Sequence, residues 1–233
     1  MNAKWVLTPD EFTLVWTRET RQHRRPYPLH TIAVVPEERD DAPRVRHRFL
    51  RRIDPELTAA LVLCARADAT TVTLFGERTD GPAVRAFAAV AQQRAGVLVA
   101  TPDAVSVSVC PPERVGRELV EAVGSAPAGR LAQLREPQDA VLRSDGPNRS
   151  AEGENRGDAA LFRRKLNAPV DGRGFITITV DPANPLSPPT RHRTWLDFSG
   201  DGRYLLTTAA HLTLTPVSDE EFADQLMRLA CLC

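Results

Sequence analysis

The fold is decided by residues 97–109, which read VLVATPDAVSVSV. Residues 97–100 are continuously apolar, and residues 105–109 alternate between valine and serine, which is the two-residue period of a strand with one buried face. Between them, Thr101-Pro102-Asp103 is typical of a tight turn. Because strands joined by a tight turn pair antiparallel, this stretch predicts a hairpin in an antiparallel sheet.

Predicted elements on both sides extend this hairpin into a larger unit. Downstream, Pro111-Pro112-Glu113 starts a helix that carries apolar residues at helical spacing and ends near Gly124. Upstream, Asp54 caps a helix over 54–64, and residues 70–75 form a strand. Residues 83–94 are compatible with either a helix or a strand. The unit therefore combines an antiparallel sheet with helices that cover it, an α+β arrangement.

The same order of elements recurs in the second half of the chain. A shift of 107 residues places Val97 on Tyr204 and Val105 on Leu212, and it carries the helix positions Val115 and Leu119 to Phe222 and Leu226. A shift of 104 residues places Val72 and Leu74 on Ile176 and Ile178. The near-constant spacing favours a pseudo-two-fold internal repeat with halves of about 1–124 and 157–233 in a single domain, 1–233. Identity between the halves is low, so chance similarity of two α+β patterns stays open.

Residues 125–156 are predicted to be a flexible linker between the halves. The first part has some helical spacing in Leu131, Leu134 and Val141, but Pro137 interrupts it. Residues 144–155 contain no apolar residue beyond one alanine, so they cannot bury enough surface to offset the entropy lost on ordering.

The first fifty residues contain one clear helix signal. Thr8 and Glu11 have the spacing of a capping box, Pro9 fits the first turn, and the helix should run to about Thr20. Residues 31–35 predict a strand, and residues 44–49 are either a strand or a mobile arm.

The composition is that of an ordinary globular protein, without the excess charge expected of a general polyanion binder. Thirty basic residues balance thirty acidic ones, 42% of the chain is hydrophobic, and no run of 18 apolar residues could span a membrane. Four cysteines do not make a disulfide framework, and the N-terminal residues lack a signal-peptide core. We therefore expect a cytoplasmic, soluble protein with no membrane span.

Arginine is concentrated near the N-terminus. Residues 18–52 contain ten arginines and five acidic residues, which indicates either a solvated face or a docking surface for an acidic partner. Nucleic-acid binding is not expected, because the interleaved aromatic residues of a base-stacking platform are missing.

No sequence motif indicates catalysis, a metal or a cofactor. The Gly-rich nucleotide loops, the nucleophile elbow and the paired-histidine zinc motif are all missing, and the five histidines lack ligand spacing. Cys231 and Cys233 are more consistent with an incidental tail than with a redox pair. Trp195 and Tyr204 are expected to pair across a hairpin and pack on a helix over 218–230, with an apolar binding platform as the alternative. The sequence therefore favours a protein that binds over one that catalyses.

Four motifs, in order along nearly the whole chain, resemble the EspG family of ESX secretion-associated proteins. They are Trp5-Val6-Leu7-Thr8-x-x-Glu11-Phe12-x-x-Val15-Trp16, Tyr27-Pro28-Leu29, Trp195-x-Asp197-x-x-Gly200-x-Gly202-Arg203-Tyr204-Leu205 and Leu212-x-Leu214-x-Pro216-Val217-x-x-Glu220-x-Phe222-x-x-x-Leu226. The resemblance implies a central antiparallel sheet with two helical bundles about a quasi-two-fold axis. It also implies a cytosolic, non-enzymatic chaperone of type VII secretion, which holds the helical tip of a PPE protein paired with a PE protein.

No family motif fixes contact residues, so the partner-binding residues are predicted from the position of three segments in the expected fold. The candidates lie in the arginine-rich segment, on two strand faces and on the last helix: Arg44, Arg46, Arg48, Phe49, Val72, Leu74, Ile176, Ile178, Phe222 and Leu226. For the strand and helix residues, core packing is the alternative reading. The competing function is a small-molecule-binding domain or enzyme with a cleft between the halves, and a homodimer also stays open.

Overall fold

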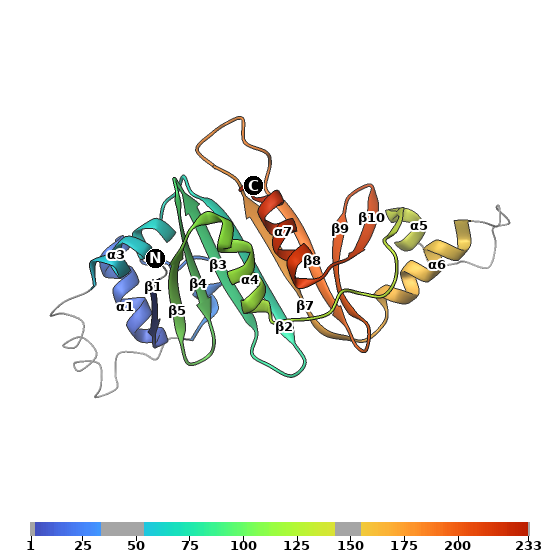
Figure 1. Ribbon diagram of the computed structural model, residues 1–233, viewed down its shortest axis with the longest axis horizontal. Helices are drawn as coiled ribbons and strands as arrows, with labels where there is room; N and C mark the ends of the chain where they lie inside the picture. Colours follow the sequence, from blue (N-terminus) through green and yellow to red (C-terminus); the bar gives the residue numbers. More distant parts are fainter. Residues whose placement is uncertain (1–2, 34–53, 143–154, 233) are drawn as a thin grey trace.

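The computed structural model describes residues 3–33, 54–142 and 155–232. In these residues ten antiparallel strands form one sheet, in the order β1-β5-β4-β3-β2-β7-β8-β9-β10-β6 (Figure 1). The strands are β1 (Ala3–Leu7), β2 (Thr70–Arg78), β3 (Val84–Ala91), β4 (Arg94–Ala100), β5 (Val105–Cys110), β6 (Leu134–Pro137), β7 (Val170–Thr179), β8 (Arg191–Phe198), β9 (Gly202–Thr208) and β10 (His211–Pro216). The helices are α1 (Pro9–Thr20), α3 (Pro55–Cys64), α4 (Val115–Val123), α5 (Gln138–Leu142), α6 (Asn155–Leu166) and α7 (Asp219–Leu229). The α+β class and the antiparallel sheet are therefore confirmed.

The β2–β7 pair lies at the centre of the sheet, and the strand order is the same on its two sides. Outward from β2 come β3, β4, β5 and β1, and outward from β7 come β8, β9, β10 and β6. In the central pair Val72 lies opposite Ile178 and Leu74 opposite Ile176.

One face of the sheet, called here the covered face, carries α4 and α7 over its middle (Figure 1). The main core lies beneath these helices and includes Trp195, whose side chain is fully buried. Its indole lies across the two central glycines: a Cβ on Gly174 would be 2.1 Å from Cη2, and one on Gly76 would be 2.5 Å from Cζ2. These two positions therefore require glycine, because any side chain would displace the ring that fills the core.

Among the described residues, the helices of the other face lie only toward its two ends. At one end α1 and α3 pack on β3, β4 and β5, with Phe87 and Leu98 in the shared core. At the other end α5 and α6 pack near β6 and β10, with Tyr204 and Phe162 in the core. Directly paired residues of neighbouring strands share a face of the sheet. Phe87 is linked through three successive pairs to β8, so the register places both groups of helices on the same face.

Arg203 joins elements from both halves on the covered side. Its side chain is 1% exposed and donates two hydrogen bonds to the Asp197 carboxylate, at 2.7 and 2.9 Å. It also donates to Asp219 at the start of α7 and to the carbonyl oxygen of Gly124 at the end of α4. A single buried cation thus holds β8, β9, α4 and α7 together.

Most of the predicted elements are present, with four corrections. The capping boxes of Thr8 with Glu11 and of Ser218 with Glu221 form, and residues 84–91 of the ambiguous segment are strand β3. Leu29–Thr31 is a 3-10 helix, so the strand expected from residue 31 does not begin there. Residues 34–53, including the predicted arm over 44–49, lie outside the described residues.

The predicted linker is the second correction. Its described part contains β6, which pairs with β10, and α5, while Asn155 already begins α6. The expected flexible connection was therefore wrong for residues 134–142, which extend the sheet edge. Residues 143–154 lie outside the described residues.

The third and fourth corrections concern the hairpin of β8 and β9. Trp195 lies opposite Leu205 and Tyr204 opposite Leu196, so the two aromatic residues are not paired. The register differs by one residue from the one that would pair the two rings, which places them on opposite faces of the sheet. Trp195 packs with Phe222 of α7, as expected, whereas Tyr204 lies on the other face. Both rings are fully buried and cannot form a binding platform.

Candidate functional site

A strip of exposed sheet lies between the two groups of helices, on the side opposite α4 and α7. We call it the open face and define it by the residues of the three central strands that lie on this side: Thr71, Thr73 and Phe75 on β2, Phe175, Thr177 and Thr179 on β7, and His192 and Thr194 on β8. Thr73 is buried, at 9% exposure, whereas the other seven are partly or largely exposed. The Phe175 side chain is 64% exposed, whereas its neighbour Ile176 on the covered face is 1% exposed. The centre of the sheet is thus buried on one side and accessible on the other.

Three aromatic rings gather at one end of the open face. Phe75 and Phe175 lie directly opposite each other in the β2–β7 pair. Tyr27, from the loop before the 3-10 helix, meets Phe75 edge-to-face with ring centroids 5.7 Å apart, and it is 43% exposed. Desolvation raises the pKa of the Tyr27 hydroxyl, which keeps it neutral at physiological pH. These rings form an uncharged apolar surface next to solvent.

Hydroxyl groups and a histidine occupy the rest of the open face. Thr177 Oγ1 lies 3.3 Å from Nδ1 of His192, and the hydroxyls of Thr179 and Thr190 are 3.3 Å apart. Short hydroxyl side chains leave the surface flat and can hydrogen-bond to a partner in several geometries. The face thus combines apolar anchors with adaptable polar groups, the composition of a protein-binding surface.

Charged residues lie at the aromatic end. Arg173 of β7 and Glu77 of β2 form an ion pair of 3.4 Å, and both side chains are more than half exposed. Arg85 donates through Nε to the hydroxyl of Thr31, which fixes the 3-10 helix against β3. Charged and polar side chains of the neighbouring strands therefore border the aromatic rings at this end of the open face.

Six of the predicted contact residues belong to the core instead. Val72, Leu74, Ile176 and Ile178 are on the central strands, as expected, but on the covered face, where each is at most 1% exposed. Phe222 and Leu226 of α7 pack against them. Core packing, the alternative reading, therefore describes all six residues, and a partner cannot reach them while α4 and α7 are in place.

The other four predicted contact residues are Arg44, Arg46, Arg48 and Phe49. They lie outside the described residues, so their role stays a prediction.

Sequence reasoning missed Phe75, Phe175 and Tyr27. The available signal was the phase of the alternation: in Thr71-Val72-Thr73-Leu74-Phe75 the phenylalanine falls in the same phase as the two threonines. Phe175 occupies the corresponding polar phase of β7. An aromatic residue in the solvent phase of a strand is a better pointer to a binding surface than the apolar phase, which the core requires.

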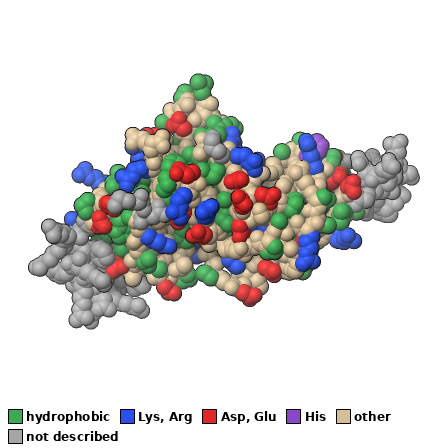
Figure 2. Space-filling model, in the orientation of Figure 1, with side chains coloured by type: hydrophobic (Ala, Val, Ile, Leu, Met, Phe, Trp, Pro, Cys, Tyr) green, Lys and Arg blue, Asp and Glu red, His purple; other side chains and the backbone are tan. Residues whose placement is uncertain are grey.

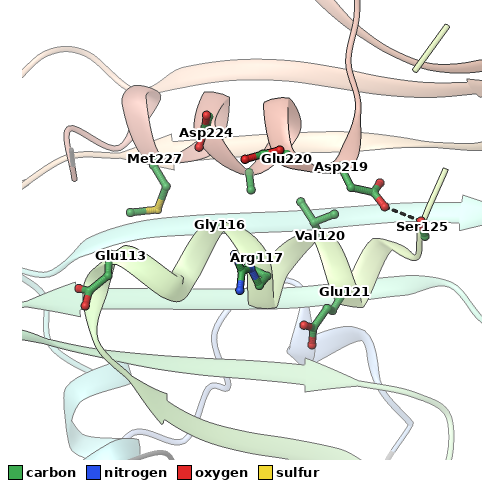
Figure 3. Close-up of a pocket in the computed structure, with 11 residues that line it drawn as sticks. Glu113, Gly116, Arg117, Val120, Glu121, Ser125, Asp219, Glu220, Asp224 and Met227 are labelled. Carbon is green, nitrogen blue, oxygen red and sulfur yellow. Dashed lines mark hydrogen bonds between the residues drawn. The ribbon is translucent and has the colours of Figure 1, made fainter. Parts of the chain in front are cut away.

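A depression among the described residues lies elsewhere, between α4 and α7 on the covered face (Figure 3). Its rim residues Glu113, Glu121, Glu220 and Asp224 are exposed, so it is an open groove. An enzyme with a cleft between the halves would instead need a closed pocket with clustered ionisable groups. Within the described ranges no three His, Cys, Asp or Glu side chains gather as a metal site. None of the helices there combines the length and hydropathy needed to cross a bilayer.

Comparison with known proteins gives one family and one informative structure. A model of the EspG family matches residues 8–228. Among solved structures, the Mycobacterium tuberculosis type VII secretion system chaperone EspG5, in complex with a PE25–PPE41 dimer, is similar with a TM-score of 0.59 and 11% identity. The alignment covers 98% of this chain and 96% of that chain, so the likeness extends over the whole fold. No curated protein sequence matches this chain.

Proposed function

Because this chain belongs to the EspG family, we propose that it is a cytoplasmic chaperone of type VII secretion, without enzymatic activity, that binds a PE–PPE heterodimer. The helical tip of the PPE subunit would occupy the open face. The fold likeness to EspG5, which was solved with a PE25–PPE41 dimer, supports this reading.

The observation that carries the proposal is the position of Phe175. A phenyl ring that is 64% exposed at the centre of a sheet, next to Phe75 and the partly exposed Tyr27, forms an apolar surface with nothing from the described chain over it. Such surfaces on folded proteins mark sites of interaction with other proteins. A helical hairpin tip with exposed apolar side chains promotes aggregation, so it needs a partner surface that covers those side chains.

The mechanism follows from the composition of the open face. The aromatic rings would bury apolar side chains of the tip, and truncating a central aromatic anchor in such an interface typically costs about 2 kcal/mol or more. The threonine hydroxyls would hydrogen-bond to polar groups at the rim. Since the anchors are few, the complex can be stable enough to prevent aggregation and still release its cargo.

Co-expression tests the function directly. The protein should form a soluble 1:1:1 complex with a PE–PPE pair encoded in the same genome, measured by size-exclusion chromatography with light scattering. If none of a complete set of such pairs forms a complex, the proposal is wrong.

A pair of variants tests the site. Phe175→Asp places a charge among the apolar anchors, so we expect at least about a 30-fold loss of affinity for the PE–PPE pair, given the cost of losing such an anchor. Val6 of β1 is also exposed, at 66%, but lies at the far edge of the sheet, so Val6→Asp should bind as the unchanged protein does. Calorimetry on both purified variants measures this, and equal affinities would exclude the open face as the binding site.

We also propose that the two halves, 1–124 and 157–233 of a single domain, form a pseudo-two-fold repeat with paired helical groups. The matching strand order outward from β2 and β7 supports this, as does the occurrence of helices before and after the strands in each half. Superposing the Cα atoms of residues 54–124 and 157–230 in an experimental structure tests the repeat. The homodimer stays a prediction, which the molar mass of the protein without partner would settle.

A further inference from the structure

A second surface that could hold a partner lies on the opposite side of the sheet from the open face. It is the groove between α4 and α7, with a volume of about 630 Å³. Gly116 and Val120 of α4 and Met227 of α7 line its apolar floor (Figure 3), together with Ala223 of α7. Val120 is 6% and Met227 8% exposed, so the floor presents a narrow apolar strip. The helices touch at the base of the groove, since a Cβ on Gly116 would lie 2.6 Å from the carbonyl oxygen of Ala223. The groove is therefore shallow, with two helical ridges as its walls.

The rim of the groove is acidic. Glu113 and Glu121 from the α4 side, and Glu220 and Asp224 from α7, are exposed and form no ion pair with any described residue. Arg117 is the only cation among the described lining residues. Figure 2 shows Asp and Glu side chains over the middle of this side of the molecule, with Lys and Arg close by.

The remaining carboxylate has a structural task. Asp219 accepts hydrogen bonds from Arg203 and Ser125, so it is part of the buried network of Arg203. Arg117 offsets part of the charge of the four rim carboxylates, and the rim stays negative overall. Unbalanced like charges around an apolar floor cost stability through mutual repulsion, which a cationic partner would relieve.

The spacing of the acidic residues has the period of a helix. Arg117 and Glu121 are four residues apart on α4, with Glu113 in the 3-10 turn that precedes this helix, and Glu220 and Asp224 are four residues apart on α7. Four residues correspond to a rise of about 6 Å along a helix axis. A helix lying lengthwise in the groove repeats its own side chains at the same interval, so cations on its two flanks can meet both ridges.

We propose that this groove binds an amphipathic helix of another protein, with small or apolar residues along one stripe and Lys or Arg on both flanks. The apolar stripe contacts Val120, Ala223 and Met227, and the cations pair with the carboxylates of the two ridges. This is the helix-in-groove mode of peptide recognition. Since the sheet separates the groove from the open face, both surfaces can be occupied together, and the proposal does not depend on what the open face binds.

The electrostatic part predicts a strong dependence on salt. Exposed ion pairs each contribute little and are screened at high ionic strength, whereas contacts with the apolar floor are not screened. Binding should therefore weaken as salt rises, without vanishing. The apolar floor fixes the position of the bound helix along the groove. The acidic rim selects a positively charged helix and speeds its association.

The probe is a fluorescein-labelled synthetic helix of 18 residues, with Leu and Ala on one stripe and Arg on both flanks, measured by fluorescence anisotropy at 50 and 500 mM NaCl. Its matched controls are a scrambled peptide of the same composition without a stripe and a peptide with Glu in place of each Arg. We expect the striped basic peptide to bind at least about fivefold more tightly than the scrambled one at both salt concentrations. We expect no binding of the acidic peptide.

Two variants locate the site on the protein. The double substitution Glu220→Gln with Asp224→Asn removes one acidic ridge and should weaken the striped peptide about fivefold, the loss of two exposed ion pairs. Glu77→Gln on the open face removes an exposed carboxylate elsewhere and should change nothing. Equal binding of the striped and scrambled peptides, or equal effects of the two sets of substitutions, would overturn the proposal, and circular dichroism confirms that each variant is folded.

Discussion

At the scale of single residues, two buried polar side chains have most influence on the fold. Arg203 connects β8, α4 and α7 through four donated hydrogen bonds, which leave little of its hydrogen-bonding capacity unused. Tyr204, next to it in sequence but on the other face, accepts a hydrogen bond from the N–H of Leu131 and donates one to Asp201. Lys165 also binds Asp201 and lies 3.9 Å from the ring centre of Phe198.

Replacing Arg203 by methionine should reduce the free energy of unfolding by about 3–5 kcal/mol, because Asp197 and the Gly124 carbonyl lose their partner in a buried place. Arg173→Met is the matched control: its ion pair with Glu77 is exposed, so the loss should be below about 1 kcal/mol. Urea denaturation measures both. Similar losses would mean that the buried network does not carry the stability assigned to it.

The buried hydroxyl of Tyr204 should make the stability of the protein depend on pH in the alkaline range. Desolvation raises the pKa of Tyr204 from 10.0 to about 12, with the Asp201 carboxylate raising it and the Leu131 N–H lowering it. Since the folded pKa is the higher one, this contribution is complete below pH 10 and is lost as the pH rises toward 12. The unchanged protein should therefore lose more stability than Tyr204→Phe between pH 10 and 12, measured by thermal melting. Parallel curves would contradict the assignment.

At the scale of elements, the crossing of α4 and α7 depends on a small residue. Replacing glycine by alanine inside a helix normally adds about 1 kcal/mol of stability. Gly116→Ala should do the opposite and cost about 1–3 kcal/mol, because the new methyl group would push α4 away from the Ala223 carbonyl. Arg117→Ala, one position along on the exposed side, is the control for helix propensity. A stabilised Gly116→Ala protein would contradict the close crossing.

Local signals predicted the elements well where side chain and backbone act within a few residues. The caps at Thr8, Asp54 and Ser218 were readable because each side chain bonds to an N–H two or three residues further on. Strand β6 and helix α5 were missed because they gain their stability from β10 and α6, which are distant in sequence. Nothing in Leu134–Pro137 itself distinguishes an edge strand from a loop.

The predicted strand residues lie on the central strands but on the buried face, and the surface proposed here for binding is the opposite one. Periodicity identifies two faces of a strand, and the apolar one was chosen as the binding surface. Which face receives helices is decided by the whole topology: α4 and α7 cover one side of β2 and β7, and no helix of the described ranges covers the other side between the two end groups. The burial of Ile176 and the exposure of Phe175 are the consequence.

At the scale of the whole molecule, the ten-stranded sheet separates two surfaces of different character. The open face is aromatic and rich in hydroxyls, and the groove on the covered face has an acidic rim around an apolar floor. Cargo and a second, basic partner can thus be held on opposite sides without competing. The fold positions both surfaces. The central β2–β7 pair provides the open face, and the last helix of each half, α4 or α7, provides one wall of the groove.

A site-specific photo-crosslink tests the central claim most directly. The phenyl ring of Phe175 is replaced by p-benzoylphenylalanine, which preserves the aromatic ring, and the purified complex with a PE–PPE pair is irradiated and analysed by mass spectrometry. If the open face binds the PPE subunit, a covalent product should form between position 175 and the tip of that subunit, and none should form from the same probe at position 6. An intact complex that gives no product from position 175, or products from position 6 instead, would contradict it.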